Sequence, residues 1–203
     1  FYHLSNHAQT GFVERRYIVE NVRLLEELLD HVETKDIPCI LFFSDFEKAF
    51  DTVDHEFLLQ TLKHFNFGDT FIQWIQMLYS NAHSCALNNG HMTESFRIER
   101  GVRQGYPLSP YLFITVIELL SHQIEHNNNI KGIVIENTKI KETLFADDAT
   151  FVTDGSEKSF SNLIDVLDEF ALISGLKLNN SKCNVLRAGS LKASNTQYLK
   201  LET

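Results

Sequence analysis

Cysteine and proline are scarce in this sequence, which narrows the possible architectures. Three cysteines occur among 203 residues, at positions 39, 85 and 183, and no two of them form a C-x-x-C pair. This spacing favours neither a disulfide framework nor a zinc site built from cysteines, and it fits a reducing intracellular setting, in the nucleus or the cytoplasm. With only three prolines and no low-complexity tract, no linker between domains is indicated.

Long apolar runs and leader patterns are missing as well. No stretch approaches the roughly 18 consecutive apolar residues that a membrane-spanning helix requires, so we expect no membrane partner. The first residues, FYHLSNHAQTGF, lack the basic and apolar blocks of a secretory signal, so we expect a protein that is not secreted. Because the first residue is not methionine, we interpret the chain as a segment of a longer polypeptide.

Basic residues are outnumbered by acidic ones, 18 to 27, which gives a net charge of −9. A surface of this sign does not attract nucleic acid through bulk electrostatics, so a nucleic-acid function needs a local basic groove. Arg97, Arg100 and Arg103 form one such local group. The 43% of hydrophobic residues is enough to bury a core in one or two globular lobes.

Periodicity predicts a mixture of helices and mostly antiparallel strands, an α+β fold. Apolar residues at helical spacing mark five stretches: 18–32, 51–67, 69–81, 111–126 and 160–174. β-rich runs predict one strand that ends at Asp45, three short strands within residues 132–155, and a last strand before Gly189. Asn89-Gly90 between alternating segments predicts a β-hairpin.

Two adjacent carboxylates interrupt an apolar stretch, LFADDATFV at residues 144–152. A buried carboxylate is costly unless it is neutralised, so Asp147 and Asp148 require a partner. Asp45 ends another apolar strand, and three carboxylates would meet if the two strands are neighbours. Mg²⁺ binds such oxygen ligands together with substrate phosphates and water. The pattern alone does not separate a metal site from a solvated acidic turn.

Four motifs that follow one another along the chain favour the metal site over the solvated acidic turn. They are FSDFEKAFDTVDH (43–55), GVRQGYPLSP (101–110), LFADDATFV (144–152) and GLKLNNSKC (175–183). Together they resemble the reverse transcriptase domain of non-LTR (LINE-type) retrotransposons, and the resemblance covers residues 8 to about 188. It implies the palm and fingers of a right-hand polymerase, in which an antiparallel sheet backed by helices carries the site and the thumb is missing or incomplete.

The resemblance also implies a division of the chain and a set of partners. Residues 1–37 would be a fingers segment, 38–188 the palm with fingers-like insertions, and 189–203 the start of a connection beyond the palm. The partners would be an RNA template, a DNA primer, dNTPs, and further domains of a parent polyprotein, including a thumb and an endonuclease. Two Mg²⁺ ions, with Mn²⁺ as a substitute, would be the cofactors.

The resemblance implies that the metal ions are bound by Asp45, the backbone carbonyl of Phe46, Asp147 and Asp148, with Asp148 in a supporting role. The three aspartates are also the expected catalytic residues, together with Lys182. This lysine would protonate or neutralise the leaving pyrophosphate, although a lysine before a strand is a common structural feature.

The resemblance also implies which residues bind the substrate: Phe46, Phe50, Arg16, Gln104 and Gly105. The ring of Phe50 would lie under the incoming sugar and leave no room for a 2′-hydroxyl, so deoxynucleotides would be preferred. Gln104 and Gly105 would approach the base pair closely, since glycine has no Cβ. Arg16 would face the triphosphate, but the sequence leaves open whether this arginine or the one before it points inward.

Some acidic and aromatic residues have simpler interpretations. Asp51 and Asp54 are expected to cap a helix rather than to bind metal. His122 and His126 have the spacing of two zinc ligands on one helix face, but no Cys or His cluster accompanies them. Trp74, with the phenylalanines near it, is expected to lie in the core.

The leading function is therefore an RNA-directed DNA polymerase domain of a LINE-type element. A group II intron or retron-type reverse transcriptase is a close alternative, because the KAFD and ADD signatures do not separate these classes. A non-catalytic, reverse transcriptase-derived remnant that binds RNA is another. A nucleotide cyclase is disfavoured, because Phe145-Ala146 stands where that class has Gly-Gly before the acidic turn.

Overall fold

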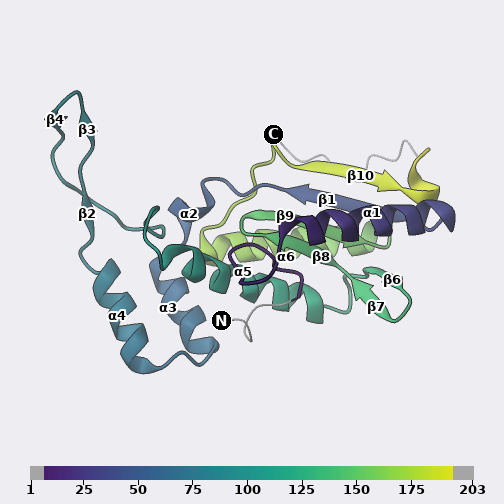
Figure 1. Cartoon of the computed structure of the whole chain (residues 1–203), viewed down its shortest axis with the longest axis horizontal. Helices are drawn as coiled ribbons and strands as arrows, with labels where there is room; N and C mark the ends of the chain where they lie inside the picture. Colours follow the sequence, from purple (N-terminus) through teal and green to yellow (C-terminus); the bar gives the residue numbers. More distant parts are fainter. Residues whose placement is uncertain (1–6, 194–203) are drawn as a thin grey trace.

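The computed structural model describes residues 7–193, which form an α+β fold around a four-stranded antiparallel sheet (Figure 1). Its strands are β1 (Cys39–Ser44), β8 (Glu142–Phe145), β9 (Asp148–Thr153) and β10 (Asn184–Ala188), and their order is β10-β1-β9-β8. The predicted fold class is confirmed. The β1 to β9 pairing joins two segments that lie far apart in the sequence, one followed by Asp45 and the other beginning at the acidic turn.

Six α-helices occur within residues 7–193: α1 (Ile18–Thr34), α2 (Ala49–Thr52), α3 (His55–His64), α4 (Asp69–Tyr79), α5 (Ser109–His126) and α6 (Glu157–Ser174). Local capping explains several boundaries. The Asp54 carboxylate accepts hydrogen bonds from the N–H groups of Glu56 and Phe57 at the start of α3. Gly175 ends α6 in the left-handed conformation, with φ of 82°. Among the described residues, no helix is both long and apolar enough to cross a membrane.

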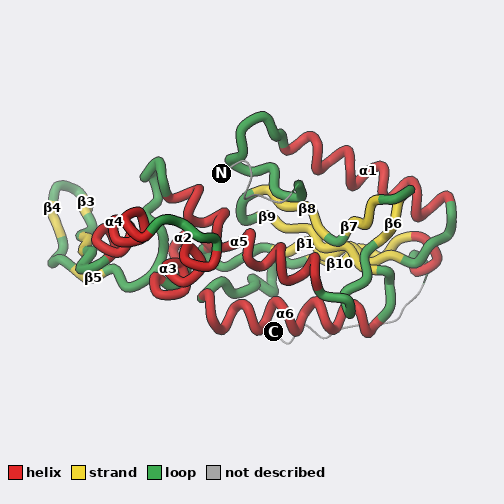
Figure 2. The backbone as a smooth tube through the Cα atoms, turned by 90° about the horizontal axis from the view of Figure 1, so that it is seen from below, coloured by secondary structure: helices red, strands yellow, loops and turns green. Residues whose placement is uncertain are grey.

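Alternate residues of β1 face two different cores, which places helices on both faces of the sheet. Ile40 and Phe42 pack with residues of α3, α5 and α6, whereas Cys39 and Leu41 pack with α1. Figure 2 shows α1 on one side of the sheet and α5 and α6 on the other. Because both faces are covered, every residue from Cys39 to Phe42 is fully buried, and the ends of the strands are left to present polar groups.

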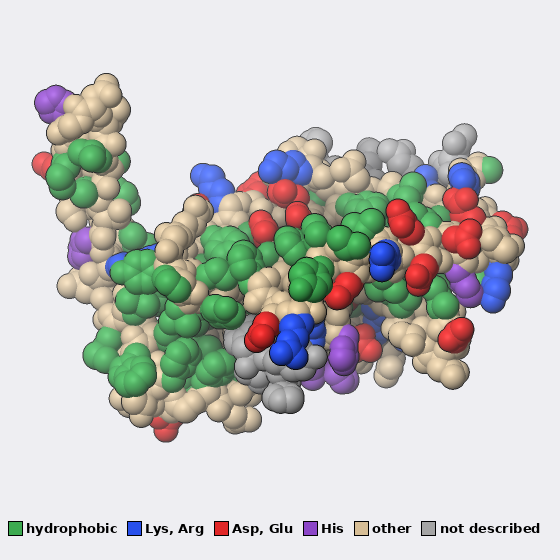
Figure 3. All heavy atoms as spheres, viewed as in Figure 1, with side chains coloured by type: hydrophobic (Ala, Val, Ile, Leu, Met, Phe, Trp, Pro, Cys, Tyr) green, Lys and Arg blue, Asp and Glu red, His purple; other side chains and the backbone are tan. Residues whose placement is uncertain are grey.

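Residues 81–100, named here the arm, form a long β-hairpin that projects from the body (Figure 1). In it β2 (His83–Ser84) pairs with β5 (Phe96–Arg97), and β3 (Leu87–Asn88) pairs with β4 (His91–Met92). Asn89 and Gly90 both have positive φ at its tip, which confirms the predicted hairpin turn. Figure 3 shows apolar side chains gathered over the region of α3, α4 and the base of the arm.

Three boundary predictions are wrong. Residues 132–155 contain four strands rather than three, because β6 (Ile133–Ile135) and β7 (Thr138–Ile140) form a separate hairpin before β8. Helix α5 begins at Ser109, two residues before the predicted start at residue 111. Asp51 lies inside the short helix α2, whose N-cap is Lys48.

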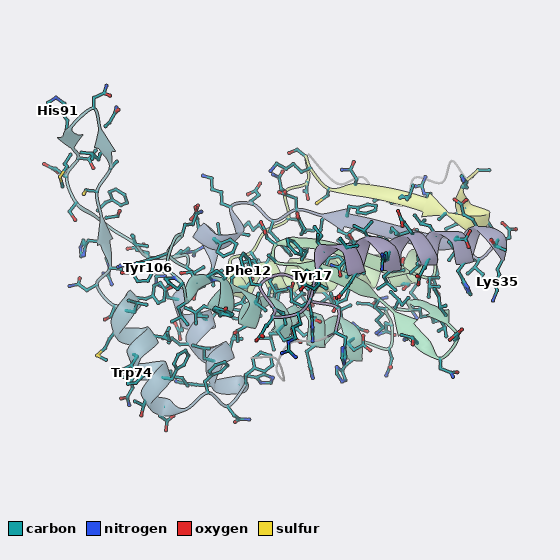
Figure 4. The ribbon with its side chains drawn as sticks, in the orientation of Figure 1. Phe12, Tyr17, Lys35, Trp74, His91 and Tyr106 are labelled. Carbon is teal, nitrogen blue, oxygen red and sulfur yellow. The ribbon has the colours of Figure 1, made fainter. Side chains whose placement is uncertain are left out.

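The expected burial of Trp74 is also wrong. Helix α4 buries Ile72, Ile75 and Tyr79 on one face, and at about 100° per residue Trp74 falls on the opposite face. Its side chain is 61% exposed and points away from the body (Figure 4). Phe67 and Phe71 are half-buried and stack on each other with ring centroids 5.4 Å apart.

Candidate active site

Strand pairing brings the three aspartates to one end of the sheet. In the register of β1 with β9, Ser44 lies opposite Ala149, so that Asp45 follows β1 beside the start of β9. The Ser44 hydroxyl donates to the Ala149 carbonyl at 3.1 Å and ties the two strands at this point. The tight turn between β8 and β9 pairs Phe145 with Asp148 and holds Asp147 at its tip.

The pKa of Asp148 reflects the closeness of its two acidic neighbours. The pKa of its carboxyl is raised above the ordinary value, first by partial burial, then by the negative charges of Asp147 and Asp45. Asp147 and Asp45 therefore both lie within Coulombic reach of Asp148. Such a cluster gains by binding a cation, which relieves the mutual repulsion.

Lys182 supplies a positive charge next to Asp45. Its Nζ lies 3.4 Å from Asp45 Oδ2, and the lysine side chain is 65% exposed. The turn that carries Lys182 also fixes the Asp45 backbone, because the Asn179 N–H donates to the Asp45 carbonyl at 2.8 Å. The structure therefore brings the fourth predicted catalytic residue to the aspartates. An exposed pair of this kind contributes little to stability, about 1 kcal/mol or less, so a chemical role remains open to this lysine.

Phe46 and Phe50 follow Asp45 on the way into and through α2. Phe46 is buried and forms an isolated antiparallel bridge with Leu178, which holds the backbone after Asp45 against the Lys182 turn. The Phe50 ring stacks on Phe113 of α5, with centroids 4.5 Å apart and an interplanar angle of 21°. Its orientation is thus fixed by the core behind it.

The loop that carries Gln104 and Gly105 is bound to α2. The Val102 N–H donates to the Phe50 carbonyl at 2.6 Å, and Gln104 Nε2 donates to Asp51 Oδ1 at 3.0 Å. Gly105 has φ of 85°, and a Cβ there would meet no atom within 4 Å. The left-handed backbone therefore explains why residue 105 is glycine. No neighbouring atom of this chain requires the absence of a Cβ there.

The two arginines of the loop before α1 point in different directions. Arg15 has φ of 64°, in the left-handed region, and its side chain is exposed. Arg16 is half-buried and its Nη1 donates to the Gln9 carbonyl at 2.7 Å. Arg16 is therefore the arginine that points inward. Figure 4 shows Phe12 and Tyr17 along this loop, and Tyr106 near the base of the arm.

Gln9 is the residue that the sequence patterns missed. It is completely buried, and its Oε1 accepts hydrogen bonds from the N–H groups of Gly11 at 2.7 Å and Ala146 at 3.0 Å. Ala146 immediately precedes Asp147 in the acidic turn. The signal in the sequence was a glutamine within the QTGF segment, and a single polar residue there does not reveal a partner so far along the chain.

The residues between 7 and 193 hold no preassembled group of three or more His, Cys, Asp or Glu side chains that could bind a metal. The His122 and His126 rings stack with centroids 4.1 Å apart, without a further ligand. The aspartates nevertheless fit Mg²⁺, because this ion usually takes only one or two protein carboxylates and completes its octahedron with phosphates and water.

Comparison with known protein families decides which family the chain belongs to. A family model described as reverse transcriptase (RNA-dependent DNA polymerase) matches residues 2–202. The chain belongs to the reverse transcriptase family. Members of this family generally use divalent metal ions, and carboxylate oxygens of the kind found at the acidic turn are suited to binding them.

Two curated relatives of this reverse transcriptase domain come from retrotransposons. A 149 kDa protein of transposon TX1 from Xenopus laevis is 31% identical over 91% of this chain. A Pol polyprotein from the type-2 retrotransposable element R2DM of Drosophila melanogaster is 29% identical over 86% of it. These matches confirm the expected resemblance to non-LTR retrotransposon reverse transcriptases. The chain spans only 14% and 16% of the length of these two relatives.

Solved structures confirm the fold. A telomerase from Candida albicans, in complex with a fragment of telomeric RNA, has a TM-score of 0.63 over 91% of this chain and 31% of its own, at 13% identity. A telomerase from Candida tropicalis, also in complex with a telomeric RNA fragment, has a TM-score of 0.60 at 13% identity and covers 89% of this chain and 30% of its own. At this identity the likeness shows that the arrangement of sheet and helices is shared.

Proposed function

We propose that this chain is the catalytic part of an RNA-directed DNA polymerase of a LINE-type retroelement. It would join the 3′-hydroxyl of a DNA primer to the α-phosphate of a dNTP on an RNA template. The single observation that carries the proposal is the pairing of β1 with β9, which sets Asp45 beside Asp147 and Asp148. The fragment of about one seventh of its relatives' length would work within a larger polyprotein that supplies further contacts to nucleic acid.

The proposed metal ligands are the carboxylates of Asp45, Asp147 and Asp148 and the carbonyl of Phe46. Two Mg²⁺ ions bound there would lower the pKa of the attacking hydroxyl and stabilise charge on the leaving oxygen, and Mn²⁺ could replace them. The chain's own contribution is to hold these oxygens on a rigid sheet end. Lys182, held 3.4 Å from Asp45, would neutralise the pyrophosphate as it leaves.

The other proposed roles concern the nucleotide. Phe50, fixed on Phe113, would present a rigid wall to the sugar and exclude a 2′-hydroxyl. Gln104 and Gly105 would contact the nascent base pair from the loop bound to α2. Arg16 would contribute positive charge toward the triphosphate. Arg97, Arg100 and Arg103 lie at the base of the arm or just after it and would attract the template strand despite the net charge of −9.

The test is primer extension on poly(rA)/oligo(dT) with Mg²⁺, in this chain and in a longer chain that includes downstream sequence of the parent gene. Asp147→Asn removes one carboxylate at constant size, and extension should fall by at least about a hundredfold. Asp168→Asn is the charge-matched control, since Asp168 is exposed on α6. Equal extension by wild type and Asp147→Asn would refute the catalytic assignment.

Three outcomes separate the alternatives. Extension by the longer chain with little by the 203-residue chain agrees with our proposal that the segment folds but needs the rest of the polyprotein to retain its substrate. RNA binding without any metal-dependent extension in either chain identifies the non-catalytic remnant. Full processive synthesis by the 203-residue chain alone contradicts the proposed dependence on further domains.

A further inference from the structure

We propose that Gln9 is a positioning residue for the acidic turn, and that the metal affinity of Asp147 and Asp148 depends on its side-chain oxygen. This inference rests on the proposed function, because it concerns the same site. Nothing in the motif pattern assigns a role to Gln9. Gln9 is completely buried, and its side-chain oxygen accepts two hydrogen bonds from the backbone, one of them from the acidic turn.

Residues 8–10 add a short parallel pairing to the outer edge of β8. The Leu144 N–H donates to the Ala8 carbonyl at 2.8 Å, and the Thr10 N–H donates to the Leu144 carbonyl at 2.9 Å. Gln9 is bridged to Leu144 between these two bonds. This edge strand places the Gln9 side chain under the end of β8, where the acidic turn begins.

The turn itself needs support. Ala146 has φ of 56°, in the left-handed region that costs a residue with a Cβ about 1 kcal/mol and persists only when its surroundings fix it. The Ala146 N–H donates to Gln9 Oε1 at 3.0 Å, inside the protein, where no solvent competes for the bond. This hydrogen bond fixes the peptide between Phe145 and Ala146, one residue before Asp147.

Gly11 shows how closely the two segments fit. A Cβ at Gly11 would overlap the Ala146 nitrogen and also lie within 3.0 Å of Gln9 Oε1. Glycine is thus required for the loop to reach the turn. The Gln9 carbonyl in addition accepts from Arg16 Nη1 at 2.7 Å. One buried residue therefore links the metal-binding turn to the arginine proposed to face the triphosphate.

The test compares Gln9→Met, which keeps the length of the side chain and removes the acceptor, with Asn21→Leu. Asn21 is the matched control because it is buried and its Nδ2 donates to the Leu144 carbonyl at 2.9 Å on the same strand, without touching the turn. Two measurements are made on the free proteins: amide hydrogen exchange over residues 145–149, and Mn²⁺ affinity by electron paramagnetic resonance.

We expect Gln9→Met to speed exchange at Ala146 and to weaken Mn²⁺ binding by about tenfold to a hundredfold, as loss of outer contacts to metal ligands generally does. Asn21→Leu should lower the melting temperature and leave both quantities at wild-type values. Gln9→Glu, which keeps an oxygen acceptor, should restore the protection of Ala146. In primer extension by Gln9→Met, kcat should fall while KM for the dNTP changes little.

Equal exchange and equal Mn²⁺ affinity in Gln9→Met and wild type would overturn the inference. So would equal losses in Gln9→Met and Asn21→Leu, since the role of Gln9 would then be structural only. If Gln9→Met does not fold, Gln9→Asn is measured in its place, because its shorter side chain withdraws the oxygen from Ala146. Wild-type protein that binds no Mn²⁺ overturns the part of the inference that concerns metal affinity, while exchange at Ala146 still decides whether Gln9 holds the turn. The proposed function fails separately, if Asp147→Asn extends primers as well as wild type does.

Discussion

Gln104 donates its side-chain amide to Asp51, with Nε2 3.0 Å from Oδ1, across 53 positions of the sequence. Asp51 lies in α2, immediately after Phe50. The Gly101 N–H donates to the Val53 carbonyl at 2.8 Å, so the whole loop is anchored on the same short helix. The orientation of Gln104 is therefore set from the segment that carries the proposed metal ligand Asp45.

Asp51→Ala should lower kcat/KM for the incoming dNTP about fivefold, because one hydrogen bond to an exposed carboxylate contributes about 1 kcal/mol. Asp51→Asn retains a side-chain oxygen that can accept from Gln104, and it should keep activity near wild type. Steady-state single-nucleotide insertion measures both variants. Equal loss in the two would show that the charge of Asp51 matters and that the bond to Gln104 does not.

Phe50→Ala should raise incorporation of rNTPs relative to dNTPs by at least about tenfold, since it opens space next to the sugar. It should also destabilise the fold by about 2 kcal/mol through the loss of the stack on Phe113. Phe71→Ala on α4 removes a comparable half-buried stacked ring away from the site. If Phe71→Ala relaxes sugar selection equally, the effect is one of stability alone.

Glu142 should make the protein more stable in mild acid than at pH 8. Its carboxyl is buried, and the Ser121 hydroxyl donates to its Oε1. Burial above all raises the pKa from 4.5 to about 7. The hydrogen bond from Ser121 lowers it, the Glu118 and Glu125 charges on α5 raise it, and the Lys141 charge lowers it. Below pH 4.5 the carboxyl is protonated in both the folded and the unfolded protein, so its full contribution to the free energy of unfolding is present. It is lost as pH rises through 7, and the total change is on the order of 3 kcal/mol.

Urea unfolding of wild type and Glu142→Gln at pH 5, 6, 7 and 8 measures this contribution. Glutamine stays neutral, so the difference in unfolding free energy between the two proteins should grow in favour of the variant as pH rises. A difference that is independent of pH would show that Glu142 ionises normally in the folded protein.

Lys141→Met should lower the melting temperature by roughly 10 °C. Lys141 is buried and its Nζ donates to the carbonyls of Ile124, Glu125 and Asn127 at 2.7 to 2.8 Å, where it caps the end of α5. Methionine leaves these three acceptors without their donor. Lys158→Met, at an exposed position of α6, is the control and should change the melting temperature by little. Similar melting of the two variants would contradict the capping role.

Features that depend on near neighbours were predictable. Asp54 caps α3 through bonds to residues two and three positions later, and the Asn89-Gly90 turn needs only the permissive φ of its own residues. Asp51 was misplaced because a capping residue and an aspartate one turn into a helix look alike in sequence. The burial of Trp74 was predicted wrongly, because an apolar ring does not by itself show whether its side of the helix faces the core or the solvent.

The order of acidic residues, apolar runs and turn residues was enough to predict the α+β class, the strand that ends at Asp45 and the acidic turn at Asp147. These depend on periodicity and local sterics, which the sequence carries directly. Only the tertiary structure decided that β1 lies between β9 and β10, that Gln104 bonds Asp51, and that Gln9 holds Ala146. Each of these contacts joins distant segments, and their pairing follows from which surfaces pack together in three dimensions.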